Sequence, residues 1–269
     1  MLAMLQRDPR MPEVDLFTLI LLALAGLGAG WVDAVVGGGG LIQLPALMIA
    51  FGPAAPVYAL ATNKVASIMG TSVSALTFYR RVQPDLTTAM PAALAALIGA
   101  CGGAVLASRI PKAALTPIIV VVLIAVLVLV LTRPQLGSTT QLRWEGNRHR
   151  GVAALVGLGI GAYDGLLGPG TGTFLVLALV GILGYAFLPA SAIAKIINFA
   201  TNLGALIFFI PAGVVVWKVG LVVGVANLVG AYIGARMAIS KGSGFVRVVL
   251  VVVVSVLVVR LGYDVVASW

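Results

Sequence analysis

The stretch that decides the fold is Gly26-Leu-Gly-Ala-Gly-Trp-Val-Asp-Ala-Val-Val-Gly-Gly-Gly-Gly40. It begins as an apolar helix that carries one carboxylate, Asp33, and it ends in four consecutive glycines. Because glycine has the largest conformational freedom of all residues, four in a row predict a break in the helix. The flanking residues are apolar enough for lipid, which tolerates bare backbone only where protein or a water-filled cavity surrounds it. A broken helix in a membrane protein is typical of a binding site.

The composition places the chain among integral membrane proteins. Of its 269 residues, 61% are hydrophobic and only 9% are charged, whereas about a quarter of the residues of a soluble domain are charged. Long apolar runs at 116–131 and 245–259 favour spanning helices over a β-barrel. The net charge of +9 is therefore attributed to helix ends and cytoplasmic loops, not to nucleic-acid binding.

The apolar runs of the first half predict helices at 16–36, 41–51, 56–79, 86–107 and 113–131. The run 41–51 is too short to span a bilayer, which takes about 20 residues. A polar, arginine-rich segment then precedes a second apolar half. We expect a first repeat at 1–132, a basic linker at 133–150 and a second repeat at 151–269.

The second half repeats the first at a constant offset of 131 residues. Asp33 recurs as Asp164, and Lys64 recurs as Lys195. Acidic and basic residues are rare in so apolar a chain, so their recurrence at one offset indicates an internal duplication. The expected fold is an all-α polytopic membrane protein of about eight transmembrane helices in two duplicated halves, with glycine-broken or re-entrant segments.

The number of crossings in each half decides the orientation of the chain. With four crossings, the N-terminus and the Arg80-Arg81 turn share the more basic side, and both termini are expected to be cytoplasmic. If 41–51 instead forms a re-entrant hairpin with the first helix, each half has an odd number of crossings and the halves are inverted.

The duplicated motif carries a family resemblance. The pattern Gly-x-x-x-x-Asp-x-x-x-Gly-x-Gly-Gly from Gly28 to Gly40, followed by Pro45 and by Ala-Thr-Asn-Lys64, resembles the TauE/SafE family of sulfite and organosulfonate exporters. The resemblance implies secondary transport of small sulfur-containing or carboxylated anions across a bacterial inner membrane. The second copy departs from the pattern, with Gly168-Pro-Gly-Thr-Gly172 for the four glycines and Ile193-Ala194 in place of Thr62-Asn63.

Two interpretations of the duplicated aspartates remain open. A carboxylate at the centre of a membrane helix costs about 2.5–3.5 kcal/mol, so something must offset its burial. Asp33 and Asp164 are candidates for proton or cation coupling. Alternatively, each aspartate caps the glycine break by accepting hydrogen bonds from bare N–H groups.

The duplicated lysines have three open interpretations. Lys64 and Lys195 can snorkel to the membrane surface, pair with an aspartate or meet the substrate anion. Helical spacing places Lys64, Ser67 and Thr71 on one polar stripe, which Lys195, Asn198 and Asn202 repeat in the second half. Such a stripe either joins helices or lines a pathway.

The glycine breaks predict the anion site itself. The first N–H groups of the short helices after each break favour an anion without a formal cation. The expected substrate-binding residues are Gly37, Gly38, Gly39, Gly40, Gln43, Thr62, Asn63, Lys64, Ser67, Thr71, Gly168, Gly170, Thr171, Thr173, Lys195, Asn198 and Asn202.

We expect a transporter and not an enzyme. No catalytic constellation can be assembled from the sequence, and a single cysteine excludes a multi-cysteine metal site. No cofactor or metal is expected; the expected partners are a small anion and membrane lipids, with association into a homo-oligomer left open. The predicted function is secondary export of small anions by alternating access at the paired breaks, with proton coupling left open. A passive channel and a scaffold without a solute are the alternatives.

Overall fold

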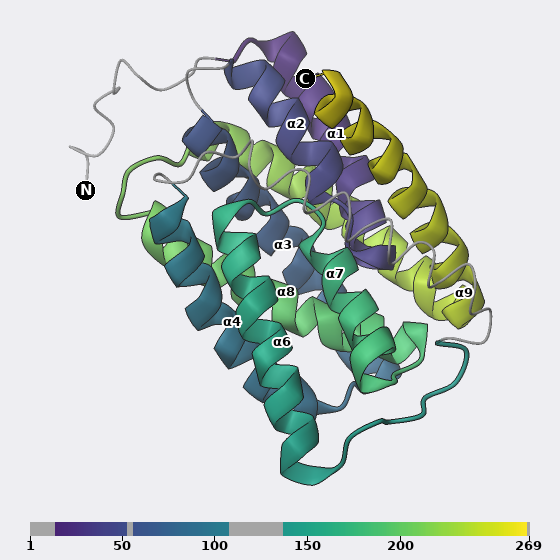
Figure 1. Ribbon diagram of the computed structural model, residues 1–269. Coiled ribbons are helices and arrows are strands. Elements are labelled where there is room, and N and C mark those ends of the chain that lie inside the picture. Colours follow the sequence, from purple (N-terminus) through teal and green to yellow (C-terminus); the bar gives the residue numbers. More distant parts are fainter. Residues whose placement is uncertain (1–13, 53–55, 108–136, 268–269) are drawn as a thin grey trace.

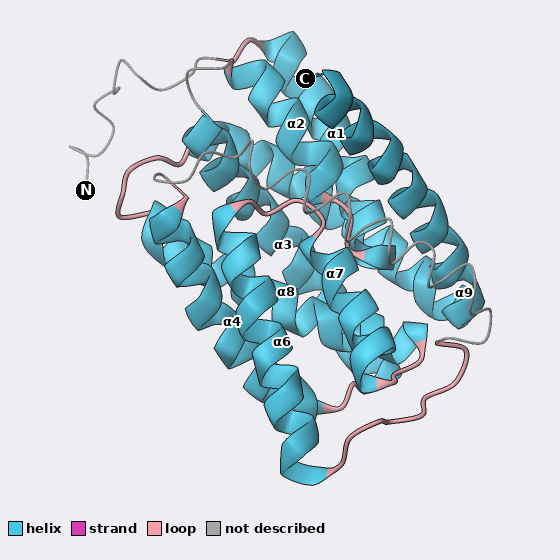
Figure 2. Cartoon of the chain, viewed as in Figure 1, coloured by secondary structure: helices cyan, strands magenta, loops and turns pink. Residues whose placement is uncertain are grey.

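The computed structural model describes residues 14–52, 56–107 and 137–267, which form helices joined by short loops (Figure 2). No strand occurs within these ranges. The predicted all-α class is therefore confirmed. The helices, labelled as in Figure 1, are α1 (Leu16–Val36), α2 (Gly40–Phe51), α3 (Pro56–Val82), α4 (Leu86–Leu106), α6 (Gly146–Leu166), α7 (Thr171–Ala178), the π-helical segment η3 (Leu179–Leu183), α8 (Phe187–Phe209) and α9 (Trp217–Ala267).

Four of the helices in the described part of the chain are long and apolar enough to cross a membrane. These are α1, α4, α8 and α9 as far as Val256. Helix α9 is divided by non-helical backbone at Gly242 (φ 74°, ψ −170°). Its second part returns toward the end of the molecule at which α1 begins (Figure 1).

The four glycines end α1 as predicted. Gly37 has a φ of 87°, a left-handed conformation that favours glycine, and its N–H donates to the Asp33 oxygen at 2.7 Å. Gly168 has the same φ of 87° at the equivalent position after α6. Each half therefore contains one helix interrupted at a left-handed glycine.

Helix α2 is a re-entrant segment. Its 12 residues extend about 18 Å at 1.5 Å per residue, too short for the hydrocarbon core. Its apolar residues pack with the first turns of α1 and α3, in a cluster that includes Leu19, Leu47 and Leu60. Helix α2 therefore returns toward the end at which α1 begins, where it lies beside α1 (Figure 1).

The halves are interlocked through equivalent helix pairs. Gly26 of α1 lies against Val223 of α9, and Gly157 of α6 lies against Ala92 of α4. The two contacts are equivalent, because Gly157 lies 131 positions after Gly26 and Val223 lies 131 positions after Ala92. The matching glycines one turn later make matching contacts. Small residues at these positions let the backbones approach closely, as in other membrane helix pairs.

The helix directions show that the halves are inverted. In the α1–α9 pair and in the α6–α4 pair, a contact further along one helix is also further along the other. The two helices of each pair therefore run parallel. Gly220 and Gly224 of α9 lie against Val65 and Met69, so α3 also runs parallel to the first part of α9. Since a short turn reverses the chain between α3 and α4 (Figure 1), α1 and α6 run in opposite directions.

The inversion corrects the expected grouping of the charged ends. Helix α1 begins at the end of the molecule opposite to the Arg80-Arg81 turn, because α1 and α3 are parallel and α2 does not cross. The beginning of α1 and this turn therefore lie at opposite ends, unlike in the expected arrangement with four crossings in each half. The end of α9 and the beginning of α1 do lie at the same end (Figure 1).

The predicted helix bounds agree closely with the structure. The first helix occupies 16–36 as predicted, and the next three differ by at most a few residues. Helix α6 begins at Gly146, so the predicted linker ends several residues too late. His149, which lies within the predicted linker, is only 5% exposed and contacts the Tyr185 hydroxyl. The predicted helix at 113–131 lies outside the described residues.

Candidate anion site at the paired helix breaks

The two helix breaks meet between the halves. A Cβ atom added at Gly37 would overlap the backbone of Gly172. The Thr173 N–H donates to the Gly37 oxygen at 3.2 Å, and the Thr173 hydroxyl donates to the Val36 oxygen at 3.1 Å. Helix α7 of the second half therefore begins directly on the end of α1.

Each lysine of the repeat pairs with the aspartate of the other half. Lys64 Nζ lies 2.7 Å from Asp164 Oδ2, and Lys195 Nζ lies 3.6 Å from Asp33 Oδ2. Lys195 Nζ also donates to the backbone oxygen of Asp33. Two ammonium and two carboxylate groups carry no net charge together, which lowers the cost of holding four ions away from water.

The burial of the lysines excludes one of their three open interpretations. Lys64 is 1% exposed and Lys195 is 0% exposed. Neither side chain reaches the surface, so the snorkelling alternative is wrong. The aspartate side chains are partners of the lysines.

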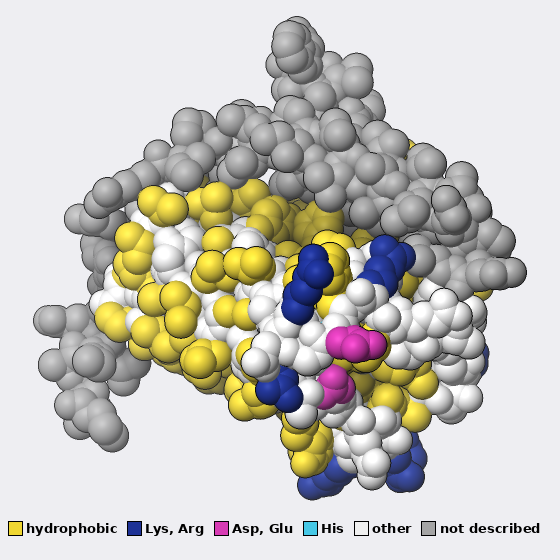
Figure 3. Space-filling model, turned by 60° about the horizontal axis from the view of Figure 1, so that its bottom comes forward, with side chains coloured by type: hydrophobic (Ala, Val, Ile, Leu, Met, Phe, Trp, Pro, Cys, Tyr) yellow, Lys and Arg dark blue, Asp and Glu magenta, His cyan; other side chains and the backbone are white. Residues whose placement is uncertain are grey.

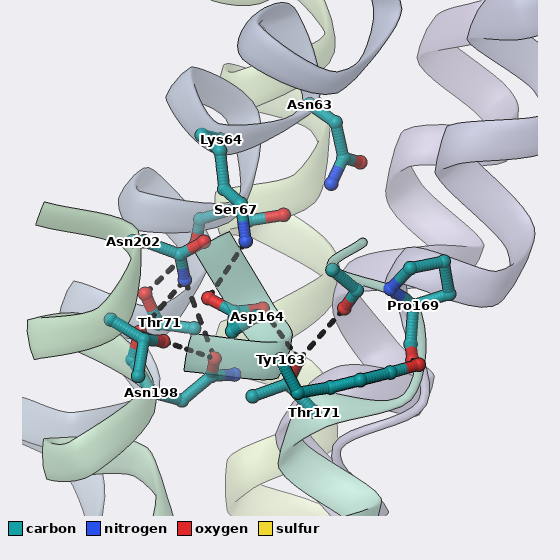
Figure 4. A network of polar contacts seen from close by, with 12 residues as sticks. Asn63, Lys64, Ser67, Thr71, Tyr163, Asp164, Pro169, Thr171, Asn198 and Asn202 are labelled. Atoms are coloured by element: carbon teal, nitrogen blue, oxygen red, sulfur yellow. Dashed lines mark hydrogen bonds and ion pairs between the residues drawn. The ribbon is translucent and has the colours of Figure 1, made fainter. Parts of the chain in front are cut away.

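Asp164 is held by groups from its own repeat as well as by Lys64 (Figure 4). The Thr171 hydroxyl lies 2.5 Å from Asp164 Oδ1 and 2.8 Å from the Gly168 oxygen. The adjacent Tyr163 hydroxyl donates to the Pro169 oxygen at 2.5 Å. The glycine-rich break, the aspartate and the first residue of α7 therefore form one polar unit.

A chain of buried amides extends the polar region across three helices. Asn227 Nδ2 of α9 donates to Gln43 Oε1 of α2 at 2.7 Å. Gln43 Nε2 in turn donates to Asn63 Oδ1 of α3 at 2.9 Å. Sequence reasoning missed Asn227, although an amide within an apolar membrane helix is rare enough to have drawn notice.

A narrow cavity lies between the ion pairs and the breaks. Its volume is about 10 Å³, near the lower limit for one water molecule. Most of its lining residues belong to the predicted site, and Gly172 is an addition. The lining residues are Asp33, Gly37, Gly40, Asn63, Lys64, Ser67, Asp164, Gly168, Gly170, Thr171, Gly172, Asn198 and Asn202.

Other residues of the predicted site lie outside this cavity and have structural contacts. The Thr62 hydroxyl accepts the Val216 N–H at 3.0 Å, and the Thr71 hydroxyl donates to the Ser67 oxygen at 2.8 Å. Gln43 and Thr173 make the contacts described above. The structure brings Gly38, Gly39, Gln43, Thr62, Thr71, Thr173 and Lys195 close to the site without placing them on the cavity wall.

This arrangement can respond to anions and protons. An anion placed at the breaks would compete with a carboxylate for a lysine and would lie near the start of α7. Protonation of an aspartate removes its negative charge and leaves the partner lysine uncompensated.

Inverted helical repeats that meet at broken helices near buried charges are typical of membrane transporters. The chain belongs to the TauE/SafE family, since the family model described as sulfite exporter TauE/SafE matches residues 22–261.

Relatives of similar length support the same class. The chain is 37% identical to the probable membrane transporter protein ORF9 of Sinorhizobium sp., over 94% of this chain and 96% of the relative. It is 34% identical to the probable membrane transporter protein YfcA of Escherichia coli K12, over 91% and 89% of the two chains. A probable membrane transporter protein of Haemophilus influenzae is 32% identical, over 94% and 97%. No solved structure matches the chain significantly.

Proposed function

We propose that this protein is a secondary transporter that exports small anions, such as sulfite, sulfonates or related carboxylates, across the bacterial inner membrane. The observation that carries the proposal is the two ion pairs that connect the halves, Lys64 with Asp164 and Lys195 with Asp33. The sulfite exporter named in the family description supports the substrate class and the direction.

The size of the cavity supports the proposal of alternating access. A space of about 10 Å³ cannot admit an anion larger than water without movement of its walls. The walls belong to both halves, so relative movement of the halves would open the site to one side at a time. Interhalf ion pairs are suited to control this movement, because an anion that displaces a carboxylate from lysine also loosens a contact between the halves.

Proton coupling is proposed at the two aspartates. Protonation of Asp164 would leave the Lys64 charge free for an anion, and Asp33 would act on Lys195 in the same way. Proton and anion would then bind together. Transport is accordingly expected to respond to a pH gradient as well as to the anion gradient.

We also propose that the end of the molecule bearing the Arg80-Arg81 turn faces the cytoplasm. Basic residues concentrate at this end, and cytoplasmic loops are enriched in them. Lys218, at the start of α9, lies at the opposite end. The beginning of α1 and the end of α9 would then face away from the cytoplasm, which reverses the orientation expected from the sequence. Among the described residues, the basic side chains at this end include Arg80, Arg81, Arg143, Arg148, Arg150, Arg236 and Lys241.

The function can be tested by uptake into proteoliposomes. The panel is sulfite, sulfoacetate, taurine, sulfate and small carboxylates, with and without a pH gradient. Saturable uptake and counterflow of at least one anion are expected, because alternating access exchanges solutes through a single site. Uptake without counterflow would favour the passive channel, and no uptake of any anion would contradict the proposal.

Matched lysine variants test the site within the same assay. Lys64→Ala and Lys195→Ala are expected to abolish counterflow, whereas Lys218→Ala, which removes an exposed lysine, is expected to leave it unchanged. Normal transport by folded Lys64→Ala protein would remove the lysine from the mechanism and favour a site elsewhere.

A further inference from the structure

A second polar cavity lies away from the paired breaks, between the end of α3 and the middle of α9. Its volume is about 360 Å³, large enough for a phosphate group with its first waters. Three arginines converge on it from two helices that are distant in sequence. The lining residues are Thr77, Arg80, Arg81, Tyr232, Arg236, Ile239 and Ser240.

The lining of the cavity is positively charged. No carboxylate is among the described residues that line it. Arg236 Nη1 donates to the Tyr232 hydroxyl at 3.1 Å, and the guanidinium carbon lies 5.4 Å from the centre of the Tyr232 ring. Tyr232 thus fixes the direction of one arginine without neutralising it.

A purely structural role explains only part of this cluster. Arg80 and Arg81 lie in the last turn of α3, where positive charge complements the helix dipole. That role does not require Arg236, which another helix brings to the same cavity. Figure 3, which turns the bottom of Figure 1 forward, shows basic side chains around acidic ones, beside a hydrophobic flank.

The surroundings of the cavity suit a ligand with an anionic head and an apolar tail. Leu76, Tyr79 and Ile233 are 46–49% exposed on the helices that form it. Exposed tyrosines beside apolar residues are typical of the boundary between lipid and water. A phosphate in the cavity would therefore lie at headgroup depth, with acyl chains along α3 and α9.

We propose that this cavity is a binding site for a phosphate group, which either an anionic phospholipid headgroup or free phosphate can supply. Arginine suits this ligand because its planar guanidinium donates two parallel hydrogen bonds to phosphate oxygens. Basic pockets between membrane helices at the cytoplasmic side bind lipid headgroups in other proteins. The site does not depend on the transport mechanism proposed above.

The test titrates the full-length protein, purified in an uncharged detergent, while its thermal unfolding midpoint is followed. The probes are short-chain phosphatidylglycerol, phosphatidylcholine of the same chain length and inorganic phosphate. Phosphatidylglycerol or inorganic phosphate is expected to raise the midpoint, because a ligand that binds the folded state stabilises it. A response to phosphatidylglycerol alone assigns the lipid headgroup, and a response to inorganic phosphate assigns free phosphate.

Arginine variants locate the response. Arg236→Gln is expected to weaken binding about fivefold, and Arg81→Gln with Arg236→Gln about 30-fold, as expected for loss of one and two basic contacts. Arg236→Lys, which keeps the charge, is expected to bind more tightly than Arg236→Gln. Arg150→Gln removes an exposed arginine outside the cavity and serves as the control.

Three outcomes would overturn the proposal. One is equal binding of phosphatidylglycerol and phosphatidylcholine with no response to inorganic phosphate. The second is unchanged binding by the Arg81 and Arg236 variants. The third is no binding of any probe to the wild-type protein. Since Arg81 and Arg236 are exposed, their variants are expected to fold, and a monodisperse elution profile checks this.

Discussion

Lys64 lies on an apolar helix and yet is enclosed by protein, with its ammonium group 2.7 Å from the Asp164 carboxylate. Asp164→Asn removes one partner and leaves a buried ammonium ion. The expected loss is about 3–5 kcal/mol of unfolding free energy. Thermal or denaturant unfolding in detergent measures it.

A double variant separates charge from shape in this pair. Lys64→Met with Asp164→Asn removes both charges, so it is expected to be more stable than Asp164→Asn alone. If the two variants are equally unstable, the loss comes from the Thr171 contact and not from the ion pair.

Gly37 requires both its conformation and its lack of a side chain. Gly37→Ala is expected to prevent the breaks from meeting, because the new Cβ would overlap Gly172. Gly213→Ala is the control, since Gly213 also has a positive φ, 70°, but has open space around it. The control is expected to lose about 1–2 kcal/mol from backbone strain alone, and Gly37→Ala more. Equal losses in unfolding experiments would show that the contact with Gly172 contributes nothing.

At the scale of helices, close packing of α4 against α6 depends on which glycines face the contact. Gly161→Leu is expected to force these helices apart, because its Cβ would meet the Ala96 backbone. Gly159→Leu is the control on the same helix, since no atom lies within 4 Å of a Cβ there. Elution profiles and unfolding midpoints compare them. Similar behaviour of the two variants would contradict the observed helix face.

The start of α4 is tied to the segment before α8 by a titratable network. Asp85 caps α4 and accepts hydrogen bonds from Thr87, Thr88 and the Tyr185 hydroxyl, the last at 2.7 Å. Burial raises the pKa of Asp85, but these hydrogen bonds outweigh it and hold the pKa below the ordinary value of 3.8. The carboxylate is therefore charged at neutral pH.

This lowered pKa predicts the direction of a pH effect. The contribution of Asp85 to stability is complete above pH 3.8 and is lost as the pH falls through its lower, folded-state pKa. Wild type should be more stable than Asp85→Asn at pH 7, and the difference should shrink in strong acid. Unfolding midpoints from pH 7 to pH 2 measure it. A difference that stays constant across this range would assign the effect of the variant to shape and not to charge.

At the scale of the whole molecule, inversion of the halves predicts on which side of the membrane each loop lies. Chemical labelling of single cysteines tests this prediction. Single cysteines replace Ala212 and Thr139 in a Cys101→Ser background, since Cys101 is the only native cysteine. Both positions are exposed and lie at opposite ends of the molecule. A membrane-impermeant thiol reagent is expected to label only Ala212→Cys from outside intact cells.

Labelling patterns distinguish the alternatives. If only Thr139→Cys is labelled, the halves are inverted as described, but the proposed orientation in the membrane is wrong. Labelling of both positions from one side would contradict the inversion itself. Leu16→Cys, at the beginning of α1, must follow Ala212→Cys, because both lie at the same end.

The sequence by itself determined the all-α membrane class, the duplication and most helix bounds. It did so because apolar runs and glycine breaks act locally, and because rare charges at a constant offset reveal a repeat. It also located Asp33, Asp164, Lys64 and Lys195, since charge is rare in apolar helices.

Only the tertiary structure decided which of these charges pair, and that the halves are inverted. Both depend on whether α2 crosses or returns, which its local sequence leaves open because a short apolar helix suits either path. The burial of His149 and the contact of Asn227 with Gln43 depend in the same way on helices far apart in the chain. Packing between the halves, which no local pattern encodes, turns two copies of one motif into a single site.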